Sequence, residues 1–182
     1  MRVLIVIVAA LLLGGCTSSS APRNTGVYLL LDTSGTYSEE LNKAEAIILY
    51  ALSRMEPADS FAVARIDTGS FSEKDIIAKT TLDDRPSTAN GQKRAFASEI
   101  KTFVEGSKPA PYTDITGGLL QATEFLNEKS MARKTILIFS DLKEDLAKGY
   151  MRDKVELDLK GFEVVALNVT KLRSDNYDPR EY

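Results

Sequence analysis

The sequence contains no histidine, and its only cysteine is Cys16. These two shortages exclude Ser-His-Asp and Cys-His catalysis, histidine-ligated metals, zinc knuckles and disulfide bonds within the chain. An excess of positive charge is also absent, because 23 lysine and arginine residues face 26 aspartate and glutamate residues, giving a formal net charge of −3. Binding to nucleic acid draws on a positive electrostatic field, so we expect no nucleic-acid partner. Any site must therefore be built from carboxylates, hydroxyls, lysine, arginine and backbone groups.

The first residues form a segment distinct from the rest of the chain. Arg2 supplies a positive charge, and the eleven residues from Val3 to Leu13 are all apolar. A helix needs about 20 apolar residues to cross a bilayer, so this run is too short to span one and is typical of a signal peptide. The following Leu13-Gly14-Gly15-Cys16 resembles the bacterial lipobox, in which the cysteine thiol receives lipid and the chain is cut just before it. A buried first strand is the alternative, but it would not explain why the single cysteine ends the apolar run.

We therefore expect residues 1–15 to be a lipoprotein signal peptide and Cys16 to carry the acyl chains. Residues 16–24 are rich in serine and show no apolar periodicity, which is typical of a flexible tether. Residue 17 is threonine rather than aspartate, which by resemblance to enterobacterial sorting favours the outer over the inner membrane. The expected location is the cell envelope, on the periplasmic side, with the membrane as a partner through the lipid anchor.

The remaining residues, 25–182, fit one globular domain, since the chain is 43% apolar and 27% charged. Residues 27–31 and 135–139 are apolar runs typical of strands buried on both faces of a parallel sheet. Further strands are predicted at 60–67, 75–82 and 162–169, the last of them buried, with helices near 38–55, 95–104, 119–126 and 150–159 and a loop at 83–90. The gap between the second and third strands is too short for a crossover, so these two should form an antiparallel hairpin with the third strand at the edge.

Strands that alternate with helices predict an α/β fold, a Rossmann-like, doubly wound, mainly parallel sheet with one antiparallel edge hairpin. The end of the chain leaves two alternatives. Asp178-Pro179-Arg180-Glu181 has the pattern of a helix start, with a capping aspartate, a proline in the first position and an acidic first turn. Either this segment is a frayed tail, or the domain continues into a last helix that this sequence lacks.

Oxygen-bearing side chains gather where predicted strands end. Asp32, Ser34 and Thr36 follow the first predicted strand at alternating positions. Asp141 follows the fourth predicted strand, and Thr113 precedes the third predicted helix. Ligands of open α/β sheets bind at the carboxyl ends of strands, and such oxygens suit a hard divalent cation or a phosphoryl group. The plainer alternative for the first cluster is a turn that caps the next helix.

These motifs resemble the metal-ion-dependent adhesion site of von Willebrand factor type A (VWA) domains. The family's Asp-x-Ser-x-Ser pattern matches Asp32, Ser34 and Thr36. Its loop threonine matches Thr113, in the stretch TDITGGLLQA, and its last aspartate matches Asp141, in ILIFSD. The resemblance covers about residues 25–170 and implies a three-layer sandwich.

The resemblance also implies that these five side chains hold Mg²⁺, or Mn²⁺ or Ca²⁺ in its place. Three neutral hydroxyls and two carboxylates would leave the cation partly positive, with one coordination position open. An aspartate or glutamate of a protein partner could fill that position. The expected function is thus cation-dependent protein binding, with no catalytic residues and no enzyme activity.

Two positions depart from the family pattern. Thr36 replaces the usual serine but keeps a hydroxyl, and Pro111-Tyr112 stand where glycines often precede the loop threonine. Tyr112 is expected to pack against the domain, with a place on the binding face as the alternative. Glu144 and Asp145 are expected to be solvated loop residues.

Two other functions compete with this interpretation. The apolar run followed by Asp-x-x-Gly-Thr also resembles haloacid-dehalogenase-like phosphatases, in which Asp32 would be the nucleophile, Lys134 would neutralise the phosphoryl group and Asp141 would hold Mg²⁺. Soluble phosphatases of this kind place a second aspartate, the general acid, where this chain has Ser34. The third alternative is a structural lipoprotein whose metal site is vestigial.

Overall fold

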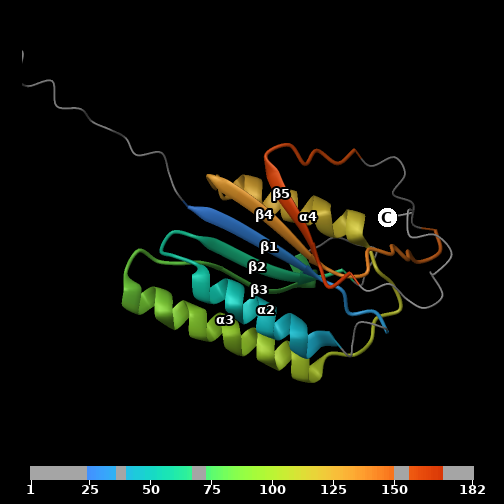
Figure 1. Ribbon diagram of the computed structural model, residues 1–182, viewed down its shortest axis with the longest axis horizontal. Helices are drawn as coiled ribbons and strands as arrows, with labels where there is room; N and C mark the ends of the chain where they lie inside the picture. The colour runs from blue at the N-terminus through green and yellow to red at the C-terminus, as the bar shows by residue number, and fades with distance from the viewer. Residues whose placement is uncertain (1–23, 36–39, 67–72, 150–155, 170–182) are drawn as a thin grey trace, which may run out of the picture.

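The computed structural model describes residues 24–35, 40–66, 73–149 and 156–169, which form a five-stranded sheet with helices on both faces (Figure 1). The strands are β1 (Thr25–Leu31), β2 (Ser60–Arg65), β3 (Ile76–Thr81), β4 (Arg133–Phe139) and β5 (Phe162–Leu167). The helices are α2 (Leu41–Arg54), α3 (Pro86–Gly106) and α4 (Ile115–Glu128), with a short 3₁₀ turn η2 (Glu73–Asp75). The predicted signal peptide, Cys16, Thr36 and the chain after residue 169 lie outside the described residues. No helix within these ranges combines the length and apolarity needed to cross a membrane.

β1 lies at the centre of the sheet, whose strand order is β3-β2-β1-β4-β5. It pairs in parallel with both β2 and β4, and β4 pairs in parallel with β5. β3 pairs antiparallel with β2 and forms one edge. The predicted α/β fold, with a mainly parallel sheet and an antiparallel edge hairpin, is therefore confirmed. Residues 27–31 are all buried, because β1 has a strand on each side and helices on each face.

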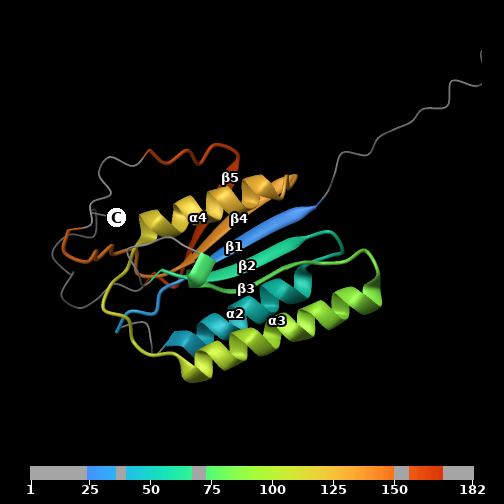
Figure 2. The same cartoon turned by 180° about the vertical axis from the view of Figure 1, so that it is seen from behind.

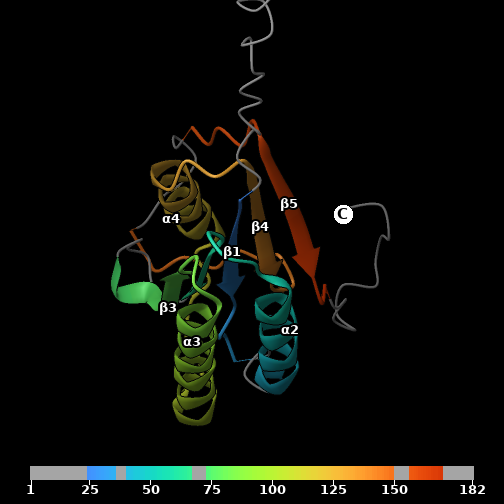
Figure 3. The ribbon, with the colours of Figure 1, turned by 90° about the vertical axis from the view of Figure 1, so that its left-hand side faces the viewer.

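Alternate residues of β1 point into two separate layers of the core. Leu29 and Leu31 pack with residues of α2 and α3, whereas Tyr28 and Leu30 pack with residues of α4. The ring of Tyr28 meets the ring of Phe125 edge-on, with 5.4 Å between the centroids. Figures 1 and 2 show α2 and α3 side by side, and Figure 3 shows α4 across the sheet from them. The domain is thus a three-layer sandwich.

The beginning of α4 lies close to the central strands because a glycine is there. A Cβ atom on Gly118 would lie 2.6 Å from Cγ2 of Ile66 and 3.0 Å from Cδ2 of Leu30, closer than packed carbon atoms approach each other. Any side chain at this position would push the start of α4 away from the sheet. The glycine therefore keeps the loop before α4 close to the end of β1.

The prediction of a loop at 83–90 is wrong for residues 86–90, which form the first turns of α3. Arg85 is extended at the N-cap, Pro86 takes the first helical position, and the Ala89 N–H donates to the Arg85 carbonyl at 3.0 Å. Proline fits the first turn because its missing N–H has no partner there in any case. The sequence Ser-Thr-Ala-Asn-Gly has weak helix propensity, but the burial of Ala89 against the sheet outweighs it.

The prediction that the last strand is buried is also wrong. β5 pairs with β4 alone among the described strands and stands at the margin of the sheet (Figure 3). Glu163, Val164 and Ala166 are exposed, and no residue of β5 is fully buried. The predicted helix at 150–159 is not present over residues 156–159, and residues 150–155 lie outside the described chain.

Candidate metal-binding site

Asp32 follows β1 directly, at the carboxyl end of the central strand. Leu31 is in register with Phe139 of β4, and the Asp32 N–H continues the pairing by donating to the Phe139 carbonyl at 3.0 Å. Ser140 therefore stands opposite Asp32, and Asp141 is one residue further along. The parallel pairing thus brings the two predicted aspartates to the same edge of the sheet, as the resemblance implies.

The carboxylate of Asp32 is the centre of the site, and the residue is only 1% exposed. Its Oδ1 accepts the Ser34 N–H at 2.8 Å and lies 3.4 Å from the hydroxyl of Thr113. Its Oδ2 accepts the hydroxyl of Ser140 at 2.7 Å. Three residues that are far apart in the sequence meet at this one side chain, and two of them, Ser34 and Thr113, were predicted as site residues.

The carboxylate of Asp141 is also largely buried, at 7% exposure. Its Oδ1 accepts the Lys143 N–H at 3.0 Å, and no hydrogen bond within the described chain reaches Oδ2. No described lysine or arginine forms an ion pair with Asp141 or with Asp32. A buried carboxylate without an opposite charge is unfavourable, and here two of them follow neighbouring strands at the same edge of the sheet. This pair of aspartates therefore fits a bound cation.

Ser140 belongs to the site although the sequence analysis did not select it. It is fully buried, and its oxygen accepts the Leu142 N–H at 3.1 Å while its proton goes to Asp32. An ionised carboxylate can only accept hydrogen bonds, which fixes the direction of that contact. The signal was available in part, because Ser140 is the first polar residue after the apolar run of β4.

The loop that carries Thr113 is held by backbone hydrogen bonds on two sides. The Thr113 N–H donates to the Asp145 carbonyl at 2.8 Å, and the Asp145 N–H donates to the Thr113 carbonyl at 2.9 Å. Asp114 donates from its N–H to the Ile66 carbonyl at 2.7 Å, and its side chain caps α4 by accepting the Gly117 N–H at 2.8 Å. Thr113 is thereby fixed with 3% exposure beside Asp32.

The segment after Asp141 helps to fix the same loop. The side chains of Glu144 and Asp145 are exposed, as expected for solvated residues. They nevertheless have structural contacts, since Glu144 accepts the Thr116 N–H at the start of α4 at 2.8 Å and Asp145 pairs with Thr113 through its backbone. The ends of β1 and β4 and the start of α4 thus form one hydrogen-bonded unit.

The donor set consists of oxygen atoms alone. The described ranges contain no cluster of three or more aspartate, glutamate, cysteine or histidine side chains. A cation at this edge would depend on hydroxyls as well as on the two carboxylates, and hard divalent cations accept such mixed oxygen ligands. Asp32, Ser34, Thr113 and Asp141 are placed at one end of the sheet, whereas the fifth predicted ligand, Thr36, lies outside the described residues.

Lys134 does not lie near Asp32. It belongs to the beginning of β4, six residues before Ser140, which corresponds to about 20 Å along a strand. Its Nζ donates to Asn127 Oδ1 at 2.5 Å and lies 5.2 Å from the centroid of the Phe162 ring. The lysine that the phosphatase alternative needs at the phosphoryl group is therefore at the opposite end of the sheet.

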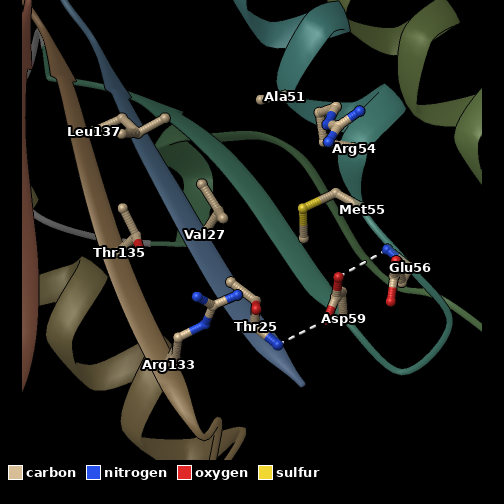
Figure 4. Close-up of a pocket in the computed structure, with 10 residues that line it drawn as sticks. All are labelled: Thr25, Val27, Ala51, Arg54, Met55, Glu56, Asp59, Arg133, Thr135 and Leu137. Atoms are coloured by element: carbon tan, nitrogen blue, oxygen red, sulfur yellow. Dashed lines mark hydrogen bonds between the residues drawn. The ribbon is translucent and has the colours of Figure 1, made fainter. Parts of the chain in front are cut away.

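A separate cavity of about 430 Å³ lies near the beginning of β1 (Figure 4). Asp32 follows the other end of this strand. Val27, Met55 and Leu137 line it together with polar residues at the strand starts. The buried carboxylate of Asp59 accepts the Thr25 N–H and the Glu56 N–H, each at 2.7 Å, on one side of this cavity. None of the predicted site residues lines it, so it is distinct from the candidate metal site.

No protein-family model matches the sequence, and no curated protein matches it. Among solved structures, a von Willebrand factor type A protein from Catenulispora acidiphila is 15% identical, with a TM-score of 0.51 over 80% of this chain and 33% of its own. The pilus adhesin SpaC from Lactobacillus rhamnosus GG is 14% identical (TM-score 0.47, 66% of this chain, 15% of its own), and manganese-loaded TRAP protein from Plasmodium vivax is 17% identical (TM-score 0.42, 65% and 46%). The chain thus spans less than half the length of each of these proteins. Such identities concern the fold alone, and the fold of this chain is that of a von Willebrand factor type A domain.

Proposed function

We propose that this chain is a protein-binding module that holds a divalent cation at the edge of its sheet and uses it to bind a carboxylate of a partner protein. The observation that carries the proposal is the pair of buried carboxylates, Asp32 and Asp141, which follow neighbouring parallel strands and form no ion pair with any described residue. The proposed ligands are these two aspartates with the hydroxyls of Ser34, Thr36 and Thr113. The proposed cation is Mg²⁺, with Mn²⁺ or Ca²⁺ as substitutes.

Coordination chemistry explains why such a site would bind rather than catalyse. Two carboxylates formally neutralise the charge of a divalent cation. Neutral hydroxyls make up much of the remaining coordination shell, so the cation still attracts another oxygen ligand. A carboxylate from outside is the strongest oxygen ligand that a protein partner can offer. The bound cation would supply this one electrostatic contact with the partner's carboxylate, and the chain's own ligands would hold the cation in position.

Phosphoryl transfer by Asp32 is the less favoured function. Lys134 lies at the beginning of β4, away from the site. No described lysine or arginine forms an ion pair with Asp32. Ser34 at the second position after Asp32 cannot act as the general acid that an aspartate would be. The hydrogen bonds to both oxygens of Asp32 also restrict it as a nucleophile.

We further propose that the domain is held at a membrane through acyl chains on Cys16, on the periplasmic side of the cell envelope and with the outer membrane favoured. The eight residues from Thr17 to Asn24 reach at most about 25–29 Å when extended. β1 begins at Thr25, and the candidate metal site lies at its other end. The tether would therefore leave the site on the part of the domain that is remote from the anchor.

A metal titration tests the cation site. Mg²⁺ or Mn²⁺ should raise the melting temperature of the detergent-purified protein, because a ligand that binds only the folded state stabilises it, by about 1.4 kcal/mol at ten times the Kd. Asp141→Ala should abolish the response and, in chelator, should equal or exceed the stability of the wild type. Asp145→Ala is the matched control, since this exposed aspartate contacts the site through its backbone only. A metal response that persists in both Asp32→Ala and Asp141→Ala would reject the site.

A further inference from the structure

Two large apolar side chains are exposed immediately beside the candidate metal site. Tyr112 is 38% exposed and Leu142 is 40% exposed, so Tyr112 does not take the packed position expected for it. The other exposed large apolar residues of the described chain lie elsewhere, on α2 and on or after β5: Leu49, Tyr50, Val164 and Val169. We call Tyr112 and Leu142 the apolar rim.

Each member of the apolar rim is connected to one oxygen of Asp32. Tyr112 precedes Thr113, whose hydroxyl lies 3.4 Å from Oδ1. Leu142 donates its N–H to Ser140, whose hydroxyl donates to Oδ2 at 2.7 Å. The backbone of both residues is therefore attached to groups that contact Asp32, and both side chains are exposed at this edge of the sheet.

Leu142 occupies a backbone conformation that is unfavourable for leucine. Its φ is +66°, in the left-handed region that glycine adopts freely and that asparagine tolerates. A leucine that is 40% exposed gains less from packing than a buried one to offset this strain, and glycine would adopt the conformation without strain. Strained residues that persist at a site are often part of its function. A leucine here is explained if its side chain contacts a partner.

We propose that the apolar rim selects the partner: among proteins able to present a carboxylate, the site prefers an acidic segment in which an apolar or aromatic residue flanks the aspartate or glutamate. This inference rests on the proposed function, because the cation fixes the carboxylate. The charge of the cation calls for the acid, and the side chains of Tyr112 and Leu142 call for an apolar neighbour. Tyrosine is enriched among the residues that contribute most to binding, and a leucine buried beside it removes further apolar surface from water.

The test is selection of short random peptides, each carrying a central aspartate, on the full-length protein in detergent with Mn²⁺ and, in parallel, with chelator. Peptides recovered only with Mn²⁺ should carry an apolar or aromatic residue within two positions of the aspartate. Each selected peptide should bind Leu142→Asn and Tyr112→Ser about tenfold more weakly than the wild type. Leu142→Asn keeps a residue that tolerates the left-handed conformation, so it separates the loss of apolar contact from a change in the loop.

Two further variants complete the comparison. Leu142→Met keeps an apolar side chain and should bind within about twofold of the wild type, and Tyr50→Ser removes an exposed aromatic on α2, 70% exposed, and should change nothing. All variants should retain the rise in melting temperature with Mn²⁺, which shows that they fold and hold the cation. Cation-dependent peptides without an apolar preference, or equal binding by Leu142→Asn and the wild type, would overturn the apolar rim while leaving the proposed function in place. Absence of any Mn²⁺-dependent peptide would overturn the inference. If the protein also showed no thermal response to Mn²⁺, the proposed function would be overturned with it.

Discussion

The hydroxyl of Ser140 donates to Oδ2 of Asp32 at 2.7 Å, so a hydrogen bond joins the residues that directly follow β4 and β1. Ser140 also accepts the Leu142 N–H and directly precedes Asp141, so it connects the segments that carry the two predicted aspartate ligands. Groups that hold a metal ligand in position without touching the metal commonly change metal affinity when they are removed. Ser140 is therefore a positioning residue of the site.

Ser140→Ala should weaken the affinity for Mg²⁺ by about 10-fold or more and lower the free energy of unfolding by about 1–2 kcal/mol, because Oδ2 of Asp32 loses its buried donor. Calorimetric titration with Mg²⁺ and urea denaturation in chelator measure the two effects separately. Ser140→Thr keeps the hydroxyl and should retain most of the affinity. An alanine variant that binds Mg²⁺ as tightly as the wild type would show that the hydrogen bond has no positioning role.

Asp59 should be important for stability but not for metal binding. Its carboxylate accepts two backbone N–H groups, those of Thr25 and Glu56, and so joins the beginning of β1 to the turn after α2 (Figure 4). Asp59→Ala should lower the free energy of unfolding by about 1–3 kcal/mol, since two part-buried backbone N–H groups lose their charged acceptor. Asp59→Asn retains one acceptor oxygen and should lose less. Urea denaturation measures the loss, and a change below about 0.5 kcal/mol for the alanine variant would contradict this role.

Tyr28 has a buried hydroxyl that finds no hydrogen-bond partner among the described residues. Tyr28→Phe should therefore leave stability unchanged or raise it by up to about 1 kcal/mol at neutral pH, because no hydrogen bond is lost and an unsatisfied polar group is removed. Thermal or urea unfolding at pH 7 measures the difference. A loss of more than 1 kcal/mol would mean that the hydroxyl has a partner, such as a bound water.

The same residue should make stability depend on alkaline pH. Burial raises the pKa of Tyr28 above its usual value, and the charge of Asp75 raises this pKa further. The folded protein thus keeps Tyr28 neutral while the unfolded chain ionises it above a pH of about 10, so the free energy of unfolding should fall as the pH rises past that value. Tyr28→Phe should reduce this fall relative to the wild type, and Tyr50→Phe, at an exposed position, should not. Equal slopes in all three proteins would refute the prediction.

The lipid anchor can be tested in a bacterial host grown with labelled palmitate. The wild-type chain should take up label and lose its first 15 residues, whereas Cys16→Ser should do neither, because no other cysteine is present to accept lipid. Gel mobility, label and membrane fractionation report the outcome. A wild-type protein without label would end the lipoprotein interpretation.

The central part of the fold could be predicted because burial leaves a direct trace in the sequence. β1 is covered on both faces over residues 27–31, and the second half of β4 is also largely covered, so both carry apolar runs, and the polar residue that follows each run marks the end of the strand. Since the carboxyl ends of parallel strands meet at one edge, the position of Asp32 and Asp141 in the site followed from the strand assignment alone.

The errors arose where the outcome depends on neighbours that the local sequence does not reveal. Residues 86–90 have the composition of a turn, and only the packing of Ala89 and the place of Pro86 at a helix start favour α3. β5 is as apolar in sequence as an inner strand, but its exposure follows from the strand order. The role of Ser140 depends on the register of β1 and β4, because its hydroxyl reaches Asp32 only when the two residues stand opposite each other.

The hydrogen bonds around Asp32 join residues that are 81 and 108 positions apart in the chain. Closing loops of this length has an entropic cost that only the assembled sheet repays, so no short segment of the chain can form the site by itself. Affinity for a cation would consequently be acquired in a single step, together with the pairing of β1 and β4. A nascent or partly unfolded chain would be unable to bind the cation or the partner, so only the fully folded domain would attach to the partner protein.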